Sequence, residues 1–265
     1  MSVPIAVTVA GSDSSGGAGI EADLKTFSAL GVYGGAIITA LTAQNTKGVF
    51  AVHNVPPDFI AAQIDAVFAD LDVSAVKIGM LGAGAAIDVV AAALDRWRPR
   101  NVVLDPVMVA SSGDELLPAD AIGRLRELLA RTRLVTPNLL EAATLLDALP
   151  AGDEDEMLAQ ARKLLEFGPR AVLIKGGHGG GPESVDLLVE GGDCLRLAAP
   201  RLPTRNTHGT GCTFASAIAA GLAKGLSLEA AAKEAKTYVS AAIAAADRLG
   251  IGAGRGPVHH FHRWW

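Results

Sequence analysis

The feature that most constrains the fold is the alternation of short apolar runs with amphipathic segments along the whole chain. The apolar runs do not alternate with polar residues, which is typical of strands buried on both faces of a parallel sheet. They are Ile5–Ala10, Ala36–Leu41, Ala75–Ile78, Val102–Leu104, Leu134–Thr136 and Ala171–Lys175. The segments between them carry one apolar stripe, as Ile60, Ile64 and Val67 do within Asp58–Leu71. This repetition predicts an α/β fold with a mostly parallel sheet and helices on both of its faces.

Two features follow the last of these runs. Ser184–Leu197 contains two apolar runs on either side of the turn Glu190–Asp193, which predicts a hairpin at the edge of the sheet. Two long Ala-rich helices are expected after it, at about Gly211–Lys224 and Leu228–Arg248. Because no linker or internal repeat interrupts the pattern, we expect residues 1–265 to form a single three-layer α/β/α domain.

Composition excludes several classes of protein. A formal charge of −5 and only 5% aromatic residues argue against nucleic-acid binding, which needs clustered cations or stacking platforms. Cys194 and Cys212 are too few and too far apart for a disulfide scaffold or a zinc site. The N-terminus lacks a basic leader region, and no apolar run reaches the ~20 residues that cross a bilayer. We therefore expect a cytoplasmic protein with no nucleic-acid or membrane partner.

A glycine-rich segment, Gly11–Gly19, follows the first predicted strand. Gly17–Ala22 matches a dinucleotide-binding fingerprint in form, but it begins several residues after the strand, and no acid follows the second strand. We interpret the segment as a loop whose backbone approaches a small ligand closely, with an ordinary glycine-rich turn as the alternative. After the second strand, Gln44 offers a donor and an acceptor that suit a ring nitrogen beside an exocyclic amine. An amide that only stabilises its loop is an equal alternative for Gln44.

The most informative motif is Arg205–Thr213, in a chain that has no Walker A sequence. Gly209, Thr210 and Gly211 open a predicted helix, whose free N–H groups and dipole make an anion hole. Cys212 falls in the first turn, where we expect a thiol pKa below about 8.5 and the capacity to take a proton from a hydroxyl group. The alternative for Cys212 is a small buried apolar residue.

Charged residues at the ends of other predicted strands complete a phosphoryl-transfer set. Asp105 is placed to organise Mg²⁺ or its waters, and Asn138 and Glu141, three residues apart on one helix face, are placed to hold the same ion through water. Lys175 is expected to bring positive charge to the phosphates, and the glycines within 176–181 to cover the nucleotide. Together these groups supply the positioning and charge neutralisation that phosphoryl transfer needs.

The C-terminus carries His259, His260 and His262, followed by Trp264 and Trp265. Without a spaced partner these histidines do not indicate a metal site, and we expect a solvated tail or a subunit contact. The two tryptophans are expected to pack onto the body of the protein or onto a partner subunit.

Several motifs in combination resemble one family. They are AGSDSSGGAGIEADLKTF, TALTAQNT, KIGML, VVLDPVM, TPNLLEA, IKGGH, NTHGTGCTFASAIAA and GPVHHFH. The chain resembles the bacterial hydroxymethylpyrimidine/phosphomethylpyrimidine kinases of thiamine biosynthesis, within the ribokinase-like group, over nearly its whole length. The resemblance implies phosphorylation of 4-amino-5-hydroxymethyl-2-methylpyrimidine, and then of its monophosphate, with ATP and Mg²⁺. It also implies a homodimer.

The resemblance assigns roles to individual residues. Gln44 would hydrogen-bond the aminopyrimidine, and the pocket would be lined by Gly11, Asp23, Met80 and Val107. Cys212 would be the catalytic base, where most ribokinase-like sugar kinases have Asp. We expect Gly209, Gly211 and Lys175 to act with Cys212 in catalysis, and the nucleotide to contact Lys175, Thr207 and Thr210. Three rivals remain: a pyridoxal kinase of the Cys-containing type, a regulatory module that binds a ligand without chemistry, and a dinucleotide oxidoreductase.

Overall fold

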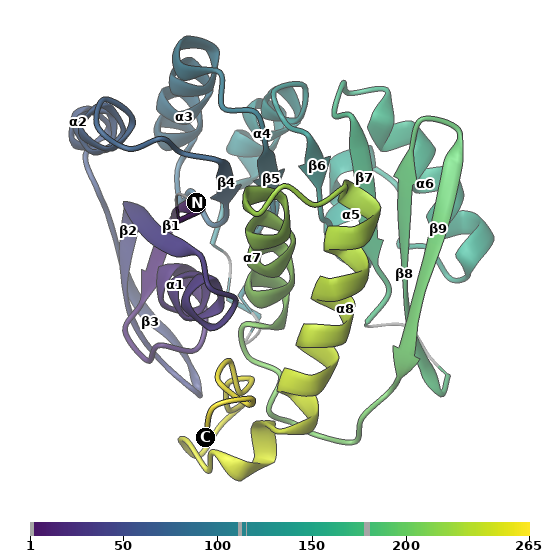
Figure 1. The fold of residues 1–265 in the computed structure, drawn as a ribbon. Coiled ribbons are helices and arrows are strands. Elements are labelled where there is room, and N and C mark those ends of the chain that lie inside the picture. Colours follow the sequence, from purple (N-terminus) through teal and green to yellow (C-terminus); the bar gives the residue numbers. More distant parts are fainter. Residues whose placement is uncertain (1–2, 111–112, 115, 178–180) are drawn as a thin grey trace.

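A computed structural model describes residues 3–110, 113–114, 116–177 and 181–265. Within these residues, nine strands form one sheet in the order β3-β2-β1-β4-β5-β6-β7-β8-β9 (Figure 1). The strands are β1 (Ile5–Asp13), β2 (Tyr33–Asn45), β3 (Gly48–Asn54), β4 (Ala75–Ile78), β5 (Val102–Leu104), β6 (Leu134–Val135), β7 (Ala171–Lys175), β8 (Glu183–Glu190) and β9 (Asp193–Pro200). The six strands in the order β2-β1-β4-β5-β6-β7 pair in parallel, and antiparallel pairing is confined to β3 at one edge and to β8 and β9 at the other. The predicted, mostly parallel sheet and its edge hairpin are confirmed.

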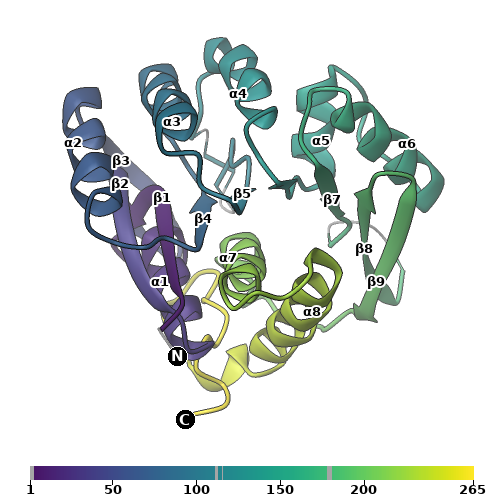
Figure 2. The same ribbon diagram turned by 45° about the horizontal axis from the view of Figure 1, so that its top comes forward.

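Helices cover both faces of the sheet, as predicted. They are α1 (Gly19–Ala29), α2 (Pro57–Phe68), α3 (Gly84–Trp97), α4 (Ile122–Leu129), α5 (Leu139–Leu146), α6 (Glu154–Leu165), α7 (Thr210–Ala223) and α8 (Leu228–Ala244). Figure 2 shows α1, α7 and α8 on one face and the other five on the opposite face. Each face has its own apolar core, because the side chains of every parallel strand point alternately to one face and to the other.

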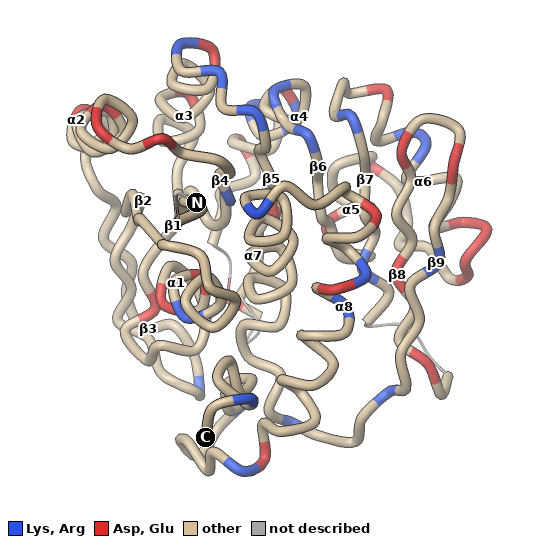
Figure 3. Tube along the Cα trace, viewed as in Figure 1, with Lys and Arg blue, Asp and Glu red and all other residues tan. Residues whose placement is uncertain are grey.

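Helix α7 lies at the centre of its face of the sheet. It carries no charged residue and is rich in Ala and Gly, so that it packs closely against both the sheet and α8 (Figure 3). A Cβ on Gly221 would lie 2.8 Å from the Cβ of Ala231 in α8, which shows how close the two helices are. This packing holds the N-terminus of α7 at the carboxyl ends of the parallel strands, where open α/β sheets bind ligands.

Some element boundaries differ from the predictions. Strand β1 continues to Asp13, so that Gly11–Asp13, predicted as loop, still pairs with β2 beyond an irregularity after Ala10. Strand β3 was not predicted, because five of its seven residues are exposed and it has no buried apolar pattern. The last helix ends at Ala244 and is followed by a 3₁₀ turn at Ala246–Arg248.

The C-terminal histidines correct another expectation. His259 and His260 are only 3% and 5% exposed, so a solvated tail is wrong for these two residues. The Nε2 atom of His260 lies 3.0 Å from Thr213 Oγ1, and burial lowers the pKa of His260 to about 3. The ring of Trp265 contacts His259 at 4.7 Å between centroids, but Trp264 and Trp265 are both 69% exposed, so the packing of the tryptophans onto the body of the protein or a partner stays a prediction. In the part of the chain that the structure describes, no helix is long and apolar enough to span a membrane.

Candidate active site

The start of α7 has the geometry of an anion-binding turn. Gly209 is the N-cap residue with φ of 78°, in the left-handed region that favours glycine, and a Cβ there would overlap the carbonyl group of Gly17. The N–H of Thr213 donates to Gly209 O at 2.9 Å. Among the described residues, the N–H groups of Gly211 and Cys212 have no acceptor. Two backbone donors and the positive end of the helix dipole are therefore free for an anion.

The two threonines of this turn bond to each other. Thr210 Oγ1 donates to Thr207 O at 2.7 Å, and the N–H of Thr210 donates to the same oxygen at 3.2 Å. The hydroxyl group of Thr210 is thus used to shape the turn. Contact of Thr207 and Thr210 with a nucleotide stays a prediction.

A lysine and two carboxylates lie beside the turn, as predicted. Lys175 Nζ, at the end of β7, lies 2.6 Å from Asp105 Oδ1 and 3.8 Å from Glu141 Oε2. A Cβ on Gly211 would lie 3.2 Å from Lys175 Nζ and 3.5 Å from Asp105 Oδ2. The absence of a side chain at Gly211 therefore lets the Lys175 ammonium group approach the backbone N–H groups of the turn. The three charged residues come from different elements that end at one edge of the sheet.

Asn138 and Glu141 are arranged differently from the prediction. Asn138 is the N-cap residue of α5, and its Oδ1 accepts a hydrogen bond from the Glu141 N–H at 2.9 Å, while Glu141 Oε2 accepts one from the Asn138 N–H at 2.7 Å. This is a capping box, so the expectation that both side chains face one ion from a helix face is wrong for Asn138. Burial raises the pKa of Glu141 to about 7, against the opposing effect of the Lys175 ammonium group.

The surroundings of Cys212 reverse the expected direction of its pKa. Burial raises the pKa of the thiol to about 11; Lys77 opposes this effect, and the carboxylates of Asp23 and Asp105 add to it. The backbone N–H of Gly19 faces the sulfur and favours the thiolate. The lowered pKa predicted from the helix start is wrong, because the loss of water and the two nearby carboxylates outweigh the dipole. In the free protein the thiol is protonated at neutral pH.

Asp23 is a buried ion-pair residue beneath Cys212. It is 0% exposed and accepts hydrogen bonds from Thr8 Oγ1 at 2.6 Å, Lys77 Nζ at 2.9 Å and Ser216 Oγ at 2.6 Å. Both carboxylate oxygens are occupied and the side chain has no exposed surface, so the place of Asp23 in the lining of the substrate pocket stays a prediction. Ser216 lies one turn after Cys212 on α7, which places the pair under the thiol.

Lys77 was not predicted as a site residue, although the sequence contains one indication that it belongs to a buried ion pair. Lys77 is the charged residue of the strand Ala75–Ile78, which is buried on both faces. A lysine in such a strand needs an anionic partner, because an unpaired buried charge is costly. Asp23 is that partner, and it holds the pKa of Lys77 above its usual range despite burial.

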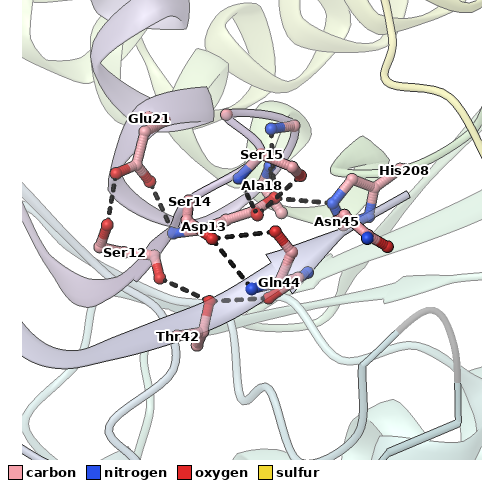
Figure 4. Close-up of polar contacts among 12 residues, drawn as sticks. Ser12, Asp13, Ser14, Ser15, Ala18, Glu21, Thr42, Gln44, Asn45 and His208 are labelled. Carbon is pink, nitrogen blue, oxygen red and sulfur yellow. Dashed lines mark hydrogen bonds and ion pairs between the residues drawn. The ribbon is translucent and has the colours of Figure 1, made fainter. Parts of the chain in front are cut away.

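Three of the other predicted pocket residues, Gly11, Met80 and Gln44, lie in or beside the first glycine-rich segment. The N–H of Gly11 donates to Met80 O at 3.0 Å, and a Cβ on Gly11 would lie 3.0 Å from the Met80 sulfur, so these two residues are neighbours. Gln44 Oε1 accepts a hydrogen bond from Thr42 Oγ1 at 3.1 Å (Figure 4). Within the described residues the amide nitrogen of Gln44 has no partner. Val107 is half-buried, and its N–H bonds to Asp105 O at 2.8 Å.

The predicted glycine cover over the nucleotide is only partly described. The N–H of Gly176 donates to Asp186 Oδ1 at 3.0 Å, which anchors the segment to β8. His178, Gly179 and Gly180 lie outside the described residues.

The fold and the site together define a class of protein. An anion-binding helix start, a lysine and two carboxylates at the carboxyl ends of parallel strands form a phosphotransferase site in a ribokinase-like fold. The family model described as phosphomethylpyrimidine kinase matches residues 13–259. The chain belongs to this family of kinases, which confirms the resemblance seen in the sequence.

Individual relatives agree with this assignment. The chain is 60% identical to hydroxymethylpyrimidine/phosphomethylpyrimidine kinase of Rhizobium meliloti over 98% of each chain. It is 52% identical to a thiamine biosynthesis bifunctional protein of Geobacter sulfurreducens, over 96% of this chain and 51% of that protein. Its structure is similar to that of pyridoxal kinase from Bacillus subtilis in complex with ADP, with a TM-score of 0.91, 37% identity and 98% coverage of each chain.

Proposed function

We propose that the protein transfers the γ-phosphate of ATP to the hydroxymethyl group of 4-amino-5-hydroxymethyl-2-methylpyrimidine and then phosphorylates the monophosphate to the diphosphate, in thiamine biosynthesis. The family match and the names of the relatives support the substrate and the pathway. The observation that carries the proposal is the turn Gly209–Cys212, which presents two free N–H groups beside Lys175.

The turn acts on the transferred phosphoryl group. In phosphoryl transfer the protein contributes mainly positioning and charge neutralisation, because little covalent chemistry is left for it to do. The N–H groups of Gly211 and Cys212 would hold the oxygens of the γ-phosphate, and Lys175 would neutralise charge on the same group. These donors are fixed by the helix before the substrate binds, so no reorganisation is needed during the reaction.

Cys212 is the proposed acceptor of the hydroxyl proton. The substrate oxygen forms its new bond to the γ-phosphorus while the bond from phosphorus to the ADP oxygen breaks, and the hydroxyl proton passes to the sulfur. Lys77 and the Gly19 N–H favour the thiolate that this role requires, whereas burial opposes it. The fraction of Cys212 that is present as the thiolate, and with it kcat, therefore depends on pH.

Asp105 and Glu141 fit a Mg²⁺ ion held through water. Mg²⁺ keeps several waters and takes one or two carboxylates together with substrate phosphates. The described residues contain no group of three or more His, Cys, Asp or Glu side chains that could hold a metal ion. When bound, the ion would neutralise charge on the nucleotide phosphates.

Kinetics with two alcohols test the proposed substrate. We expect kcat/KM for the hydroxymethylpyrimidine to exceed that for pyridoxal, and ADP release to depend on the pyrimidine. Pyridoxal is the second alcohol because the similar structure from Bacillus subtilis is that of a pyridoxal kinase. A much larger kcat/KM for pyridoxal would overturn the assignment, and no ADP release with either compound would favour a regulatory module.

We also propose that the protein forms a homodimer. Among the described residues β3 is an edge strand of the sheet, and its Phe50 and Val52 are 69% and 42% exposed, which is unusual for large apolar side chains at a sheet edge. Light scattering after size-exclusion chromatography should give twice the chain mass of 27.1 kDa. A Phe50→Asp variant should dissociate if β3 forms the interface, and a monomeric wild-type protein would contradict the proposal.

A further inference from the structure

One carboxylate organises the whole first glycine-rich segment. Asp13 is buried at the end of β1, and its Oδ1 accepts hydrogen bonds from the N–H and the hydroxyl group of Ser15 at 2.9 and 2.7 Å. Its Oδ2 accepts hydrogen bonds from the N–H groups of Gly17 at 3.1 Å and Ala18 at 2.9 Å (Figure 4). The same oxygen lies 2.8 Å from Nε2 of His208, which is 195 positions away in the sequence. The loop is thus folded around Asp13, and Asp13 is tied to His208.

His208 is held rigidly directly before the catalytic turn. Its N–H donates to Gly256 O at 3.0 Å, and its carbonyl oxygen accepts a hydrogen bond from the Val258 N–H at 3.3 Å. A Cβ on Gly17 would overlap the imidazole ring, so that the ring is closely packed against the loop. The next residue is Gly209, the N-cap of α7. A displacement of His208 would therefore move the start of the anion-binding turn.

The loop contacts both ends of the proposed substrate site. Ser14 Oγ accepts a hydrogen bond from the Gln44 N–H and donates one to Gln44 O, both at 2.9 Å. At the other end of the loop, Gly17 and Ala18 lie against the turn, since a Cβ on Gly209 would overlap Gly17 O and lie 3.3 Å from Ala18 Cα. The N–H of the next residue, Gly19, favours the Cys212 thiolate. A single segment of residues 12–19 therefore connects the amide that would read the pyrimidine with the group that would accept its proton.

We propose that Asp13 and His208 form a positioning pair, which holds this loop against the start of α7 and fixes the separation between Gln44 and Cys212. Neither Asp13 nor His208 is proposed to contact the reacting atoms. The inference rests on the proposed function, because it places Gln44 and Cys212 at two ends of one substrate. A misplacement of about 1 Å between reacting groups can lower a rate by about 100-fold, so a loosened pair should act mainly on kcat.

Three variants in a Cys194→Ser background test the pair. His208→Leu removes the ring nitrogen, His208→Gln keeps a donor at a comparable reach, and His262→Leu is the matched control. The Nε2 atom of His262 is buried without a partner among the described residues, and its Nδ1 atom lies 3.1 Å from His259 O, so the control loses a histidine hydrogen bond that involves neither the loop nor the turn. We expect His208→Leu to lower kcat by about 10- to 100-fold, His208→Gln to recover most of that loss, and His262→Leu to stay within about twofold of the parent. The Kd for ADP should change by no more than about twofold in all three, because ADP lacks the phosphate that the turn would hold.

A second readout does not depend on the substrate. Without the pair, the Gly19 N–H should no longer face Cys212 steadily, so the rate of Cys212 alkylation at fixed pH should change by about threefold or more in His208→Leu and be restored in His208→Gln. If His208→Leu does not fold, Asp13→Asn is measured in its place by the same criteria. Equal losses in the Leu and Gln variants, or a folded variant with kcat and alkylation rate both within about twofold of the parent, would overturn the proposal.

The outcomes separate this inference from the proposed function. If the parent protein phosphorylates pyridoxal and not the pyrimidine, the proposed substrate is wrong, and the variants are compared with pyridoxal as the alcohol. If it phosphorylates neither compound, the alkylation rates alone decide whether the pair positions the loop at Cys212.

Discussion

The protonation state of the Cys212 thiol is set by opposing effects of its surroundings. The helix start favours the thiolate, and so do Lys77 and the Gly19 N–H, but burial and the carboxylates of Asp23 and Asp105 favour the neutral thiol. The balance leaves the pKa at about 11, well above that of a reactive cysteine at an open helix start. At neutral pH a thiol with this pKa is mostly protonated, which protects it from oxidation because the thiolate is the reactive form.

Replacement of Cys212 by Ala should lower kcat far more than it weakens binding. General base groups contribute typically about 10²- to 10⁴-fold, and the anion hole, Lys175 and the pocket remain in place in the variant. Steady-state kinetics with both substrates varied would measure the effect. A kcat within about twofold of the wild-type value would reduce Cys212 to a packing residue.

The raised pKa of Cys212 predicts a pH dependence with a definite sign. Since the thiolate is the form that accepts a proton, kcat should rise with pH from 7 toward 9, and it should not level off where an ordinary thiol does, at about 8.5. Alkylation of Cys212 by iodoacetamide in a Cys194→Ser variant should rise in parallel, toward a midpoint at about 11. A plateau of both rates at or below about pH 8.5 would show that the thiolate is stabilised more strongly than this environment implies.

At the scale of elements, the Asp23–Lys77 pair joins three of them. Asp23 comes from α1 and Lys77 from β4, and Ser216 on α7 donates to the same carboxylate. Both charged side chains are fully buried, so each depends on the other to offset its lost hydration. The pair therefore fixes α1 and β4 relative to the helix that carries the catalytic turn.

Replacement of Lys77 by Met should be strongly destabilising. It leaves Asp23 buried without its counter-charge, which costs about 3–5 kcal/mol of unfolding free energy, measured by urea denaturation. The double variant Lys77→Met with Asp23→Asn should recover part of that loss, because no unpaired charge remains. Lys233→Met is the matched control, since its exposed pair with Glu229 on α8 is worth only about 0.3–0.5 kcal/mol. Equal effects of Lys77→Met and Lys233→Met would contradict this account of the pair.

At the scale of the whole molecule, ligand binding should stabilise the fold measurably. The proposed site draws on the carboxyl ends of β5 and β7, the start of α7 and the loop after β1, so a bound nucleotide and pyrimidine would connect elements that are far apart in sequence. A ligand at 100 times its Kd adds about 2.7 kcal/mol to the unfolding free energy.

For a chain of this size, that stabilisation should raise Tm by about 5–10 °C. Differential scanning fluorimetry with a non-hydrolysable ATP analogue, Mg²⁺ and the pyrimidine would measure it. The Cys212→Ala variant should keep the shift, because it loses a catalytic group and not a binding surface. Absence of any shift at millimolar ligand would count against the site itself.

Much of the architecture could be predicted from local sequence. The buried strands Ala75–Ile78, Val102–Leu104 and Ala171–Lys175 were predicted with the bounds that the structure shows, and the hairpin turn at Glu190–Asp193 lies where it was expected. The glycine-rich start of α7 and the convergence of Lys175 with Asp105 and Glu141 were predictable as well, because parallel strands end at a common edge. Strand β3 was missed because an exposed edge strand leaves no periodic apolar signal.

The family, the layered fold and several of the residues that gather at the site could be predicted from the amino-acid sequence, because these depend on patterns a few residues long and on strand order. The interactions among those residues could not, because they are set by tertiary contacts. The tertiary structure buried Asp23 on Lys77, used Asn138 as a helix cap, raised the pKa of Cys212 and joined Asp13 to His208. Hydration, charge and hydrogen bonding at a side chain are set by neighbours in space, and at this site those neighbours come from segments as far as 195 positions apart.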